Sequence, residues 1–308
     1  MSPRAALVVM AYGTPRSPDE VEAYYSHIRR GRAPSPEQLA ELQGRYEAIG
    51  GVSPLAARTA RQAAAIGDAL TVEDELGAWQ VVLGNKHVEP SLEAAVAEAA
   101  AGQPDVIVGL VMAPHYSAAS VGQYHDRAAR SAKDAGVPYA PIDHWHDQSA
   151  WLDAQAARVR AELAGLPDAT HVLFTAHSLP ERVLADDPYA DQLAASATAI
   201  ATRAGVDDGS WSLAWQSAGR TPEPWRGPDV CDVIRGLGDD DTVDGVLVCP
   251  QGFVSDHLEV LYDLDIEADQ VATDAGVAFA RTTSINDDPA VMAALATRVR
   301  QAAGELPR

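Results

Sequence analysis

The most informative stretch of this chain is Leu173-Phe-Thr-Ala-His-Ser-Leu-Pro180. Its apolar run predicts a buried strand that ends at His177, and the residues after it are typical of a helix start. A second stretch, Gly252-Phe-Val-Ser-Asp-His-Leu-Glu259, follows the apolar run 245–250 in the same way. Each stretch delivers a proton acceptor or metal ligand just beyond a strand. This pattern indicates a sheet whose strand ends carry the chemistry.

Apolar, β-branched runs recur along the whole chain, between longer stretches rich in Ala, Glu and Arg that have a helical period. Strands are predicted over 5–11, 79–83, 106–112, 139–142, 171–176, 211–216, 245–250 and 277–281. Helices are predicted over 18–29, 36–49, 54–70, 91–101, 121–135, 148–163, 188–203 and 289–303. Strands that alternate with helices predict an α/β fold, in which helices cover both faces of a parallel sheet.

The eight predicted strands fit two four-stranded halves better than a single sheet, with a boundary near residues 143–150. We expect one domain over residues 1–145 and a second over 146–308, whose last helix could pack back on the first domain. Parallel sheets bind ligands at the carboxyl ends of their strands, so facing halves would form one cleft. Unusual polar residues follow four further strands: Tyr12-Gly13-Thr14-Pro15, Gly84-Asn-Lys-His87, Pro114-His115-Tyr116 and Gln216-Ser-Ala-Gly219.

The composition is strongly acidic, with 44 Asp and Glu against 23 Lys and Arg, and Lys86 and Lys133 are the only lysines. Such a surface is typical of a salt-rich, halophilic cytoplasm, although a GC-rich genome would also favour Arg over Lys. Nucleic acid and anionic membranes are poor partners for this charge. The chain has neither a charged-then-apolar leader nor a long apolar run, so we expect a cytoplasmic protein that does not insert into membranes.

The charge is distributed unevenly along the chain. Residues 1–62 contain eight Arg against six Asp and Glu, a net charge of +2, and the remaining residues therefore carry −23. A basic region in an acidic protein indicates a bound anionic ligand. The alternative is an ordinary solvated helix face.

The segment that begins at Glu259 carries carboxylates at positions 259, 263 and 267, which we call the acidic row. Their spacing of four residues predicts that they lie along one helical face, where like charges repel. The acidic row therefore suggests a path for a cation or for protons, and Asp256 and His257 add ligand-type atoms before it. A solvated acidic face, and a purely structural role for His177, are the alternatives.

Six segments of the chain, taken in order, closely resemble ferrochelatases, which insert ferrous iron into a porphyrin. The resemblance runs from residue 5 to the C-terminus and implies two Rossmann-like domains around a porphyrin cleft. The segments that carry it are Met10-Ala-Tyr-Gly-Thr-Pro15, His27-Ile-Arg-Arg-Gly-Arg32, Arg45–Leu55, Ala113-Pro-His-Tyr-Ser117, Ser212–Pro228 and Cys249–Glu267.

By this resemblance, His177 corresponds to the family's catalytic histidine, which accepts a pyrrole proton, and Glu259 to its partner. Asp263 and Glu267 correspond to acids thought to relay metal or protons. The implied metal-binding set is therefore His177, Glu259, Asp263 and Glu267, with ferrous iron as substrate. A second divalent ion, Mg²⁺, is also expected to suit the acidic row.

The resemblance also implies how the porphyrin is held. Tyr12 corresponds to a tyrosine near the iron, and its Ala-Tyr-Gly-Thr context and the Arg29-Arg30-Gly-Arg32 cluster resemble coproporphyrin III ferrochelatases. Coproporphyrin has four propionates, so we expect coproporphyrin III rather than protoporphyrin IX, and we expect the enzyme to be a monomer. The expected substrate-binding residues are Tyr12, Arg29, Arg30, Arg45, Tyr46, Ser53 and Tyr124.

Only two cysteines are present, Cys231 and Cys249, and they cannot supply the four ligands of a usual iron–sulfur cluster. No [2Fe–2S] cluster is therefore expected, although many actinobacterial relatives contain one. Three other readings remain: a protoporphyrin IX ferrochelatase, a cobalt or nickel chelatase of a sirohydrochlorin-type ring, and a haem carrier that uses Tyr12 as a ligand. A carrier would need neither a pyrrole base nor an acidic row.

Overall fold

The computed structural model of the protein describes residues 5–72 and 79–305. Its strands are β1 (Ala5–Ala11), β2 (Trp79–Asn85), β3 (Val106–Val111), β4 (Tyr139–Ile142), β5 (Thr170–His177), β6 (Trp211–Gln216), β7 (Gly245–Cys249) and β8 (Ala278–Arg281). Its α-helices are α1 (Val21–Ile28), α2 (Pro36–Ala48), α3 (Leu55–Val72), α4 (Leu92–Ala101), α5 (Val121–Asp134), α6 (Ser149–Leu163), α7 (Glu181–Leu184), α8 (Tyr189–Ala204), α9 (Val230–Gly238), α10 (Leu258–Tyr262), α11 (Asp269–Ala275) and α12 (Pro289–Glu305).

The strands form two four-stranded parallel sheets with the same internal order. One sheet has the strand order β2-β1-β3-β4 and the other the order β6-β5-β7-β8. In each sheet the strand that comes first in the sequence is central, and the second strand pairs with it on one side. The third and fourth strands lie on its other side. The point where the direction reverses is where open α/β sheets bind ligands. In the second sheet this point lies between β5 and β7, whose ends carry His177 and the segment that leads to Glu259. The predicted α/β class with two parallel sheets is confirmed.

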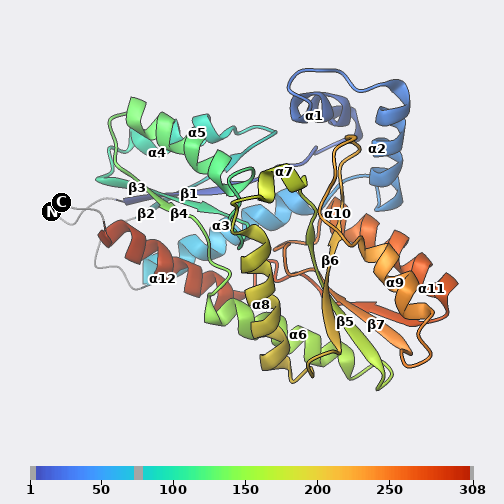
Figure 1. Cartoon of the computed structure of the whole chain (residues 1–308). Coiled ribbons are helices and arrows are strands. Elements are labelled where there is room, and N and C mark those ends of the chain that lie inside the picture. Colours follow the sequence, from blue (N-terminus) through green and yellow to red (C-terminus); the bar gives the residue numbers. More distant parts are fainter. Residues whose placement is uncertain (1–4, 73–78, 306–308) are drawn as a thin grey trace. The chain divides into compact units, whose positions relative to one another are not determined.

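Within the described residues, one compact unit comprises residues up to 113, 119–145 and those from 286 onward. Its sheet is covered by α4 and α5 on one face and by α3 and α12 on the other (Figure 1). The last helix is tied to α3 by the Arg300 guanidinium, which donates to the carbonyl oxygen of Ala69 at 2.6 Å. Gln62 Nε2 donates to the carbonyl oxygen of Asn286 at 2.8 Å. The chain therefore returns to its first unit after completing the second.

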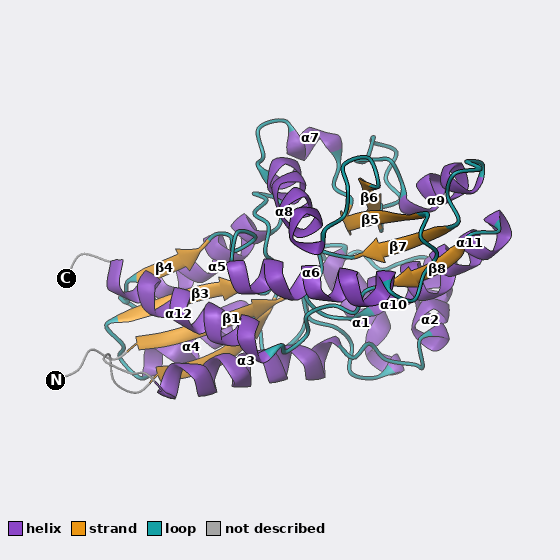
Figure 2. Ribbon diagram, turned by 90° about the horizontal axis from the view of Figure 1, so that it is seen from below, coloured by secondary structure: helices purple, strands orange, loops and turns teal. Residues whose placement is uncertain are grey.

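The second unit comprises residues 114–118 and 146–285. Helices α6 and α8 pack together, as do α9 and α11, and the β5–β8 sheet lies among them (Figure 2). The short segment 114–118 is held on α8 by hydrogen bonds: the Tyr116 amide donates to Gln192 Oε1 at 2.7 Å, and His115 Nε2 lies 2.8 Å from Ser196 Oγ. The polar residues of this segment thus anchor the backbone.

Burial explains why the central strands form where they do. Every residue of β1, β3 and β7 is buried, and β5 is buried except at its half-exposed His171 and His177. Continuous apolar runs of this kind are typical of parallel strands covered on both faces. Among residues 5–72 and 79–305, no helix is both long and apolar enough to cross a bilayer.

The segment after Glu259 differs from the regular helix that the carboxylate spacing predicts. It begins as α10, becomes a π-helix over Asp263–Ala268, and continues as α11. A π-helix closes its hydrogen bonds one residue further along the chain, which widens the turn and commonly marks a functional site. The i, i+4 geometry expected of an α-helix therefore does not apply along the whole acidic row.

Candidate active site

His177 is the last residue of β5, and its imidazole is fixed by two neighbours. Its Nδ1 donates to the carbonyl oxygen of Ser178, and its Nε2 lies 3.6 Å from Glu259 Oε1. A carbonyl oxygen only accepts hydrogen bonds, so Nδ1 carries a proton in every state. The nitrogen that gains or loses a proton is therefore Nε2, which faces the carboxylate.

The Glu259 carboxylate lies between two imidazoles. Its Oε2 is 3.4 Å from Nε2 of His257, whose Nδ1 contacts the carbonyl oxygen of Ser255 at 3.0 Å. The ring of Phe253 lies 5.1 Å from that of His257 and 6.5 Å from that of His177, measured between centroids. The Phe253 ring gives the group one apolar side, while the His177 and Glu259 side chains remain 34% and 35% exposed.

The interaction between His177 and Glu259 shifts the pKa values of both side chains. Burial by itself lowers the pKa of His177, but the Glu259 charge, the bond to Glu259 and the Ser178 carbonyl outweigh it and raise the pKa to about 9. Burial raises the pKa of Glu259, and the neighbouring His177 and His257 overcome this and hold it well below the ordinary range. At neutral pH the pair is therefore an imidazolium beside a carboxylate.

A pH titration should reveal this coupling directly. We expect the His177 ring resonances to shift with a midpoint near pH 9 in NMR spectra, assigned by their loss in His177→Ala. In Glu259→Gln the largest stabilising charge is gone, and burial is opposed only by the Ser178 carbonyl and Asp263, so the midpoint should fall well below pH 9. A midpoint that stays unchanged in Glu259→Gln would show that the carboxylate does not hold the proton.

Two side chains at the end of β6, Gln216 and Ser217, position the acidic row. Gln216 accepts a bond from Thr175 Oγ1 at 2.9 Å, and its Nε2 donates to the Glu259 carbonyl oxygen at 3.0 Å. Ser217 adopts a left-handed backbone (φ 60°), and its hydroxyl donates to the buried Asp263 carboxylate. Both contacts link the end of β6 to the helix that begins at Glu259, so the acidic row is fixed from the sheet side.

Arg281 fixes the same segment from the last strand. Its Nη1 lies 2.8 Å from Asp256 Oδ1, and its Nη2 donates at 2.8 Å to Asp265, which also accepts from Nε. Asp256 is buried and also accepts from the Ser284 amide at 3.2 Å. Asp256, which the sequence offers as a metal ligand, is thus occupied by a structural ion pair.

The other unit gathers aromatic and basic side chains beyond β1 and β2. The rings of Tyr12 and His87 lie 4.5 Å apart, and His87 Nδ1 lies 3.0 Å from His27 Nδ1. Burial, together with Lys86, lowers the pKa of His87 to about 3, so this imidazole stays neutral. Lys86 Nζ lies 4.9 Å above the Tyr124 ring, and burial lowers its pKa to about 8.

The remaining predicted substrate residues lie on α1, on α2 and before α3. Arg29 follows α1, its guanidinium 5.6 Å from the Tyr25 ring, and its buried Nε has no hydrogen-bond partner among the described residues. Arg30 is exposed with a left-handed backbone (φ 58°), and Arg45 lies 4.0 Å from Glu41. Tyr46 and Ser53 are buried; the Tyr46 hydroxyl lies 3.3 Å from Thr14 Oγ1, and Ser53 Oγ accepts from the Leu55 amide.

Comparisons with known proteins agree with this geometry. The model of the family described as Ferrochelatase matches residues 4–303. The chain belongs to the ferrochelatase family. It is 45% identical over 302 residues to the coproporphyrin III ferrochelatase of Geobacillus kaustophilus, covering 96% of this chain and 95% of that protein. It is 42% identical over 308 residues to that of Bacillus subtilis, covering 98% of each.

Solved structures show the ferrochelatase fold in more distant proteins. SirB from Bacillus subtilis with Fe³⁺ superimposes with a TM-score of 0.54 at 16% identity, covering 97% of this chain and 96% of that one. CbiX, described as the terminal enzyme of sirohaem biosynthesis in denitrifying bacteria, gives 0.53 at 16% identity, with 98% and 99% covered. At this identity the likeness is one of fold alone.

Several residues of this ferrochelatase site carry no assigned role in the sequence reading. Gln216 ends a predicted strand and Lys86 and His87 follow another, so the sequence marks these positions. It does not show which residues they contact, because the contacts depend on the neighbouring strands. Arg281 gave no signal, because its carboxylates lie 16 and 25 residues away in the chain.

Proposed function

We propose that this protein inserts ferrous iron into coproporphyrin III, giving coproheme in haem biosynthesis. The observation that carries the proposal is the imidazole–carboxylate–imidazole arrangement of His177, Glu259 and His257 at the end of β5 and the start of α10. Family membership supports the reaction, and the names of relatives 40–45% identical support coproporphyrin III as the substrate.

The reaction releases two protons from the pyrrole nitrogens as one divalent ion enters the ring. We assign one of these protons to Nε2 of His177, the nitrogen left open by the bond from Nδ1 to Ser178. That nitrogen is protonated in the resting pair, so it must first lose its proton. An approaching divalent cation would lower the His177 pKa by charge repulsion. Nε2 would then release its proton before it accepts one from a pyrrole nitrogen.

The acidic row is the proposed route for the cation and the released protons. Glu259 is half-exposed, Asp263 is buried against Ser217, and Glu267 is half-buried. Oxygen ligands of this type also suit Mg²⁺, which we propose as a second ion here. Cys231 and Cys249 are free thiols whose pKa values burial raises to about 12, which supports the proposal that the protein holds no [2Fe–2S] cluster.

Porphyrin binding is assigned to Tyr12, Arg29, Arg30, Arg45, Tyr46, Ser53 and Tyr124. Within this set Tyr12 is assigned a place near the iron, and the propionates are assigned to Arg29, Tyr46, Ser53 and Tyr124. The buried Nε of Arg29 supports this assignment most directly, because an unsatisfied buried donor is costly unless a ligand accepts from it. We expect Arg29→Ala to weaken coproporphyrin binding about 10- to 100-fold, the range of one charge-assisted hydrogen bond, with less effect on the rate of the bound complex.

Fluorescence quenching of coproporphyrin III would measure this loss of affinity. Arg130→Ala is the matched control, because it removes the same charge from the exposed face of α5, where Arg130 Nε donates to the Asp126 carbonyl oxygen of its own helix. An affinity equal to wild type in Arg29→Ala would refute the propionate assignment.

We propose that the protein works in a salt-rich, halophilic cytoplasm, which its acidic surface supports. We also propose that it is a monomer. The chain has a net charge of −21, and self-repulsion of this size is screened only by salt. We therefore expect the thermal unfolding midpoint to rise steadily as KCl increases from dilute buffer to molar concentration. A midpoint independent of KCl would contradict the halophilic reading, and sedimentation velocity in the same series would test the monomer.

The function itself is tested by anaerobic ferrous insertion, followed by absorbance, with coproporphyrin III and protoporphyrin IX offered in parallel. Preferential conversion of coproporphyrin is the expected result. Conversion of protoporphyrin alone would reverse the substrate, and activity only with cobalt or nickel and a sirohydrochlorin-type ring would reassign the reaction. Tight porphyrin binding without insertion of any metal would make the protein a carrier.

A further inference from the structure

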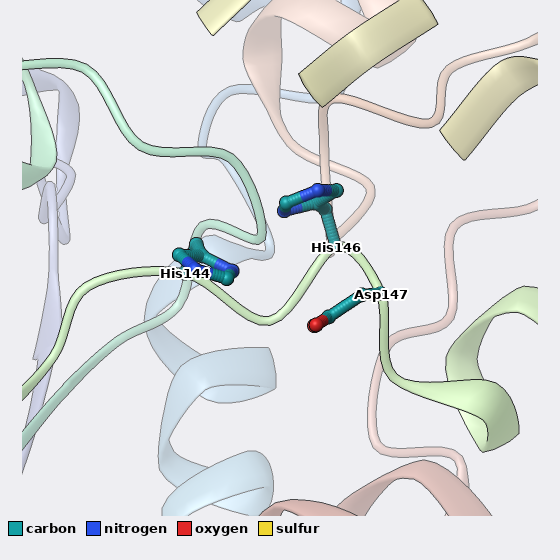
Figure 3. Close-up of side chains that lie close together, drawn as sticks. All are labelled: His144, His146 and Asp147. Carbon is teal, nitrogen blue, oxygen red and sulfur yellow. The ribbon is translucent and has the colours of Figure 1, made fainter. Parts of the chain in front are cut away.

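The segment that joins β4 to α6 carries a compact group of potential metal ligands. One ligand atom from each of His144, His146 and Asp147 lies within 4.8 Å of the others (Figure 3). The two histidines are half-buried and the aspartate is exposed, so solvent reaches the group. We propose that these three residues bind a divalent first-row transition metal ion of the imidazole-preferring class, to which Fe²⁺ and Zn²⁺ belong.

The local backbone explains why the three side chains converge. Residues 143–145 have no regular secondary structure and lead from the end of β4 into a turn at 146–147. Trp145, between the two histidines, is fully buried, and its Nε1 donates to the Val111 carbonyl oxygen at 3.1 Å. His144 and His146 flank this anchored tryptophan, and the turn at 146–147 places the Asp147 carboxylate close to both rings (Figure 3).

The orientation of His146 is also supported from its other side. Its ring stacks on that of His115 with centroids 5.7 Å apart, and His115 is fixed by its contact with Ser196 Oγ at 2.8 Å. A ligand held before the metal arrives loses less side-chain entropy on binding, which favours affinity. Because the three residues span only four positions of the chain, this short stretch of backbone alone brings them together.

The ligand set fits the proposed class of ion. Two imidazoles and one carboxylate are the protein ligands of many zinc and non-haem ferrous sites, and they leave positions for water. Bonds of about 2.1 Å place tetrahedral ligand atoms about 3.4 Å apart, so atoms that lie within 4.8 Å must approach by up to about 1.4 Å, which rotation of the exposed Asp147 can provide. Mg²⁺ and Ca²⁺ prefer oxygen ligands and should bind poorly.

Co²⁺ is a suitable probe, because its visible absorption reports histidine ligation. The titration uses the full chain after treatment with a chelator, in a His177→Ala, Glu259→Gln background that removes those two proposed ligands. We expect one Co²⁺ to bind, Zn²⁺ to displace it, and Mg²⁺ to leave it in place. Asp147→Asn and His144→Asn should each weaken Co²⁺ binding at least tenfold.

Asp241→Asn is the matched control for Asp147→Asn, since it removes one exposed carboxylate from the turn between α9 and β7 and should leave Co²⁺ affinity unchanged. Failure of the background protein to take up Co²⁺ would overturn the proposal. So would uptake that survives both Asp147→Asn and His144→Asn, because the ion would then lie elsewhere. Asp147 is exposed, so its variant should fold even if a histidine variant does not. None of these outcomes depends on insertion activity, so the test stands apart from the proposed function.

Discussion

Replacing His177 with alanine is expected to reduce the rate of ferrous insertion by about 10²–10⁴, the contribution typical of a positioned proton acceptor. The reason lies in its tautomer: with Nδ1 committed to the Ser178 carbonyl, Nε2 is the nitrogen available to a pyrrole proton, and alanine supplies no replacement. Porphyrin affinity should change little, because we assign binding to the propionate anchors. Single-turnover absorbance at saturating coproporphyrin III measures the step directly.

His171 provides the control for this prediction. It is a half-buried histidine of the same strand, and its Nε2 lies 3.0 Å from Ser212 Oγ, so its replacement tests the loss of an imidazole from β5 without touching the proposed site. His171→Ala should insert iron at a rate close to wild type. Normal turnover by His177→Ala would remove its role as proton acceptor, whatever the substrate proves to be.

Breaking the Arg281 ion pairs is expected to cause the largest loss of stability. Its side chain is 12% exposed and that of Asp256 is 6% exposed, so Arg281→Gln leaves a buried carboxylate without its counter-ion. Removing one partner of such a pair costs about 3–5 kcal/mol. The thermal unfolding midpoint should fall accordingly, and insertion should slow because the segment from Asp256 to Asp265 carries Glu259.

An exposed arginine on α9 gives the matching comparison. Arg235 pairs with Asp232 at 2.6 Å, but the side chains are 58% and 72% exposed, so water replaces the lost contact. Arg235→Gln should therefore shift the free energy of unfolding by less than about 1 kcal/mol. Equal losses in the two variants would show that the Arg281 pairs do not hold the segment.

Much of the fold follows from local pattern. Strands 5–11, 139–142 and 211–216 are predicted at their observed bounds, because apolar runs bounded by polar turns are unambiguous in a parallel sheet. Helix α9 is missing from the prediction; it is short, with nine residues, and follows a region rich in Gly and Pro. The π-helix could not be predicted, since a shift of one hydrogen bond leaves no trace in residue spacing.

The candidate site divides in the same way. Strand ends predicted the positions of His177, Gln216 and the segment that leads to Glu259, because the ends of parallel strands gather at one edge of a sheet. The hydrogen-bond and ion-pair partners of the site residues could not be predicted from the sequence. Asp256 has the side chain of a metal ligand, and only the tertiary structure shows that Arg281 and the Ser284 amide occupy it.

The return of α12 to the first unit sets the order in which the protein can be completed on the ribosome. The face of α3 that contacts α12 has no partner until residues 289–305 have been synthesised. At about 5–20 residues per second, the 146 residues between β4 and α12 take about 7–30 s to appear. During that interval the second unit can fold while the first still exposes the apolar face of α3. Chaperones are therefore expected to bind mainly to the first unit, although it is synthesised first.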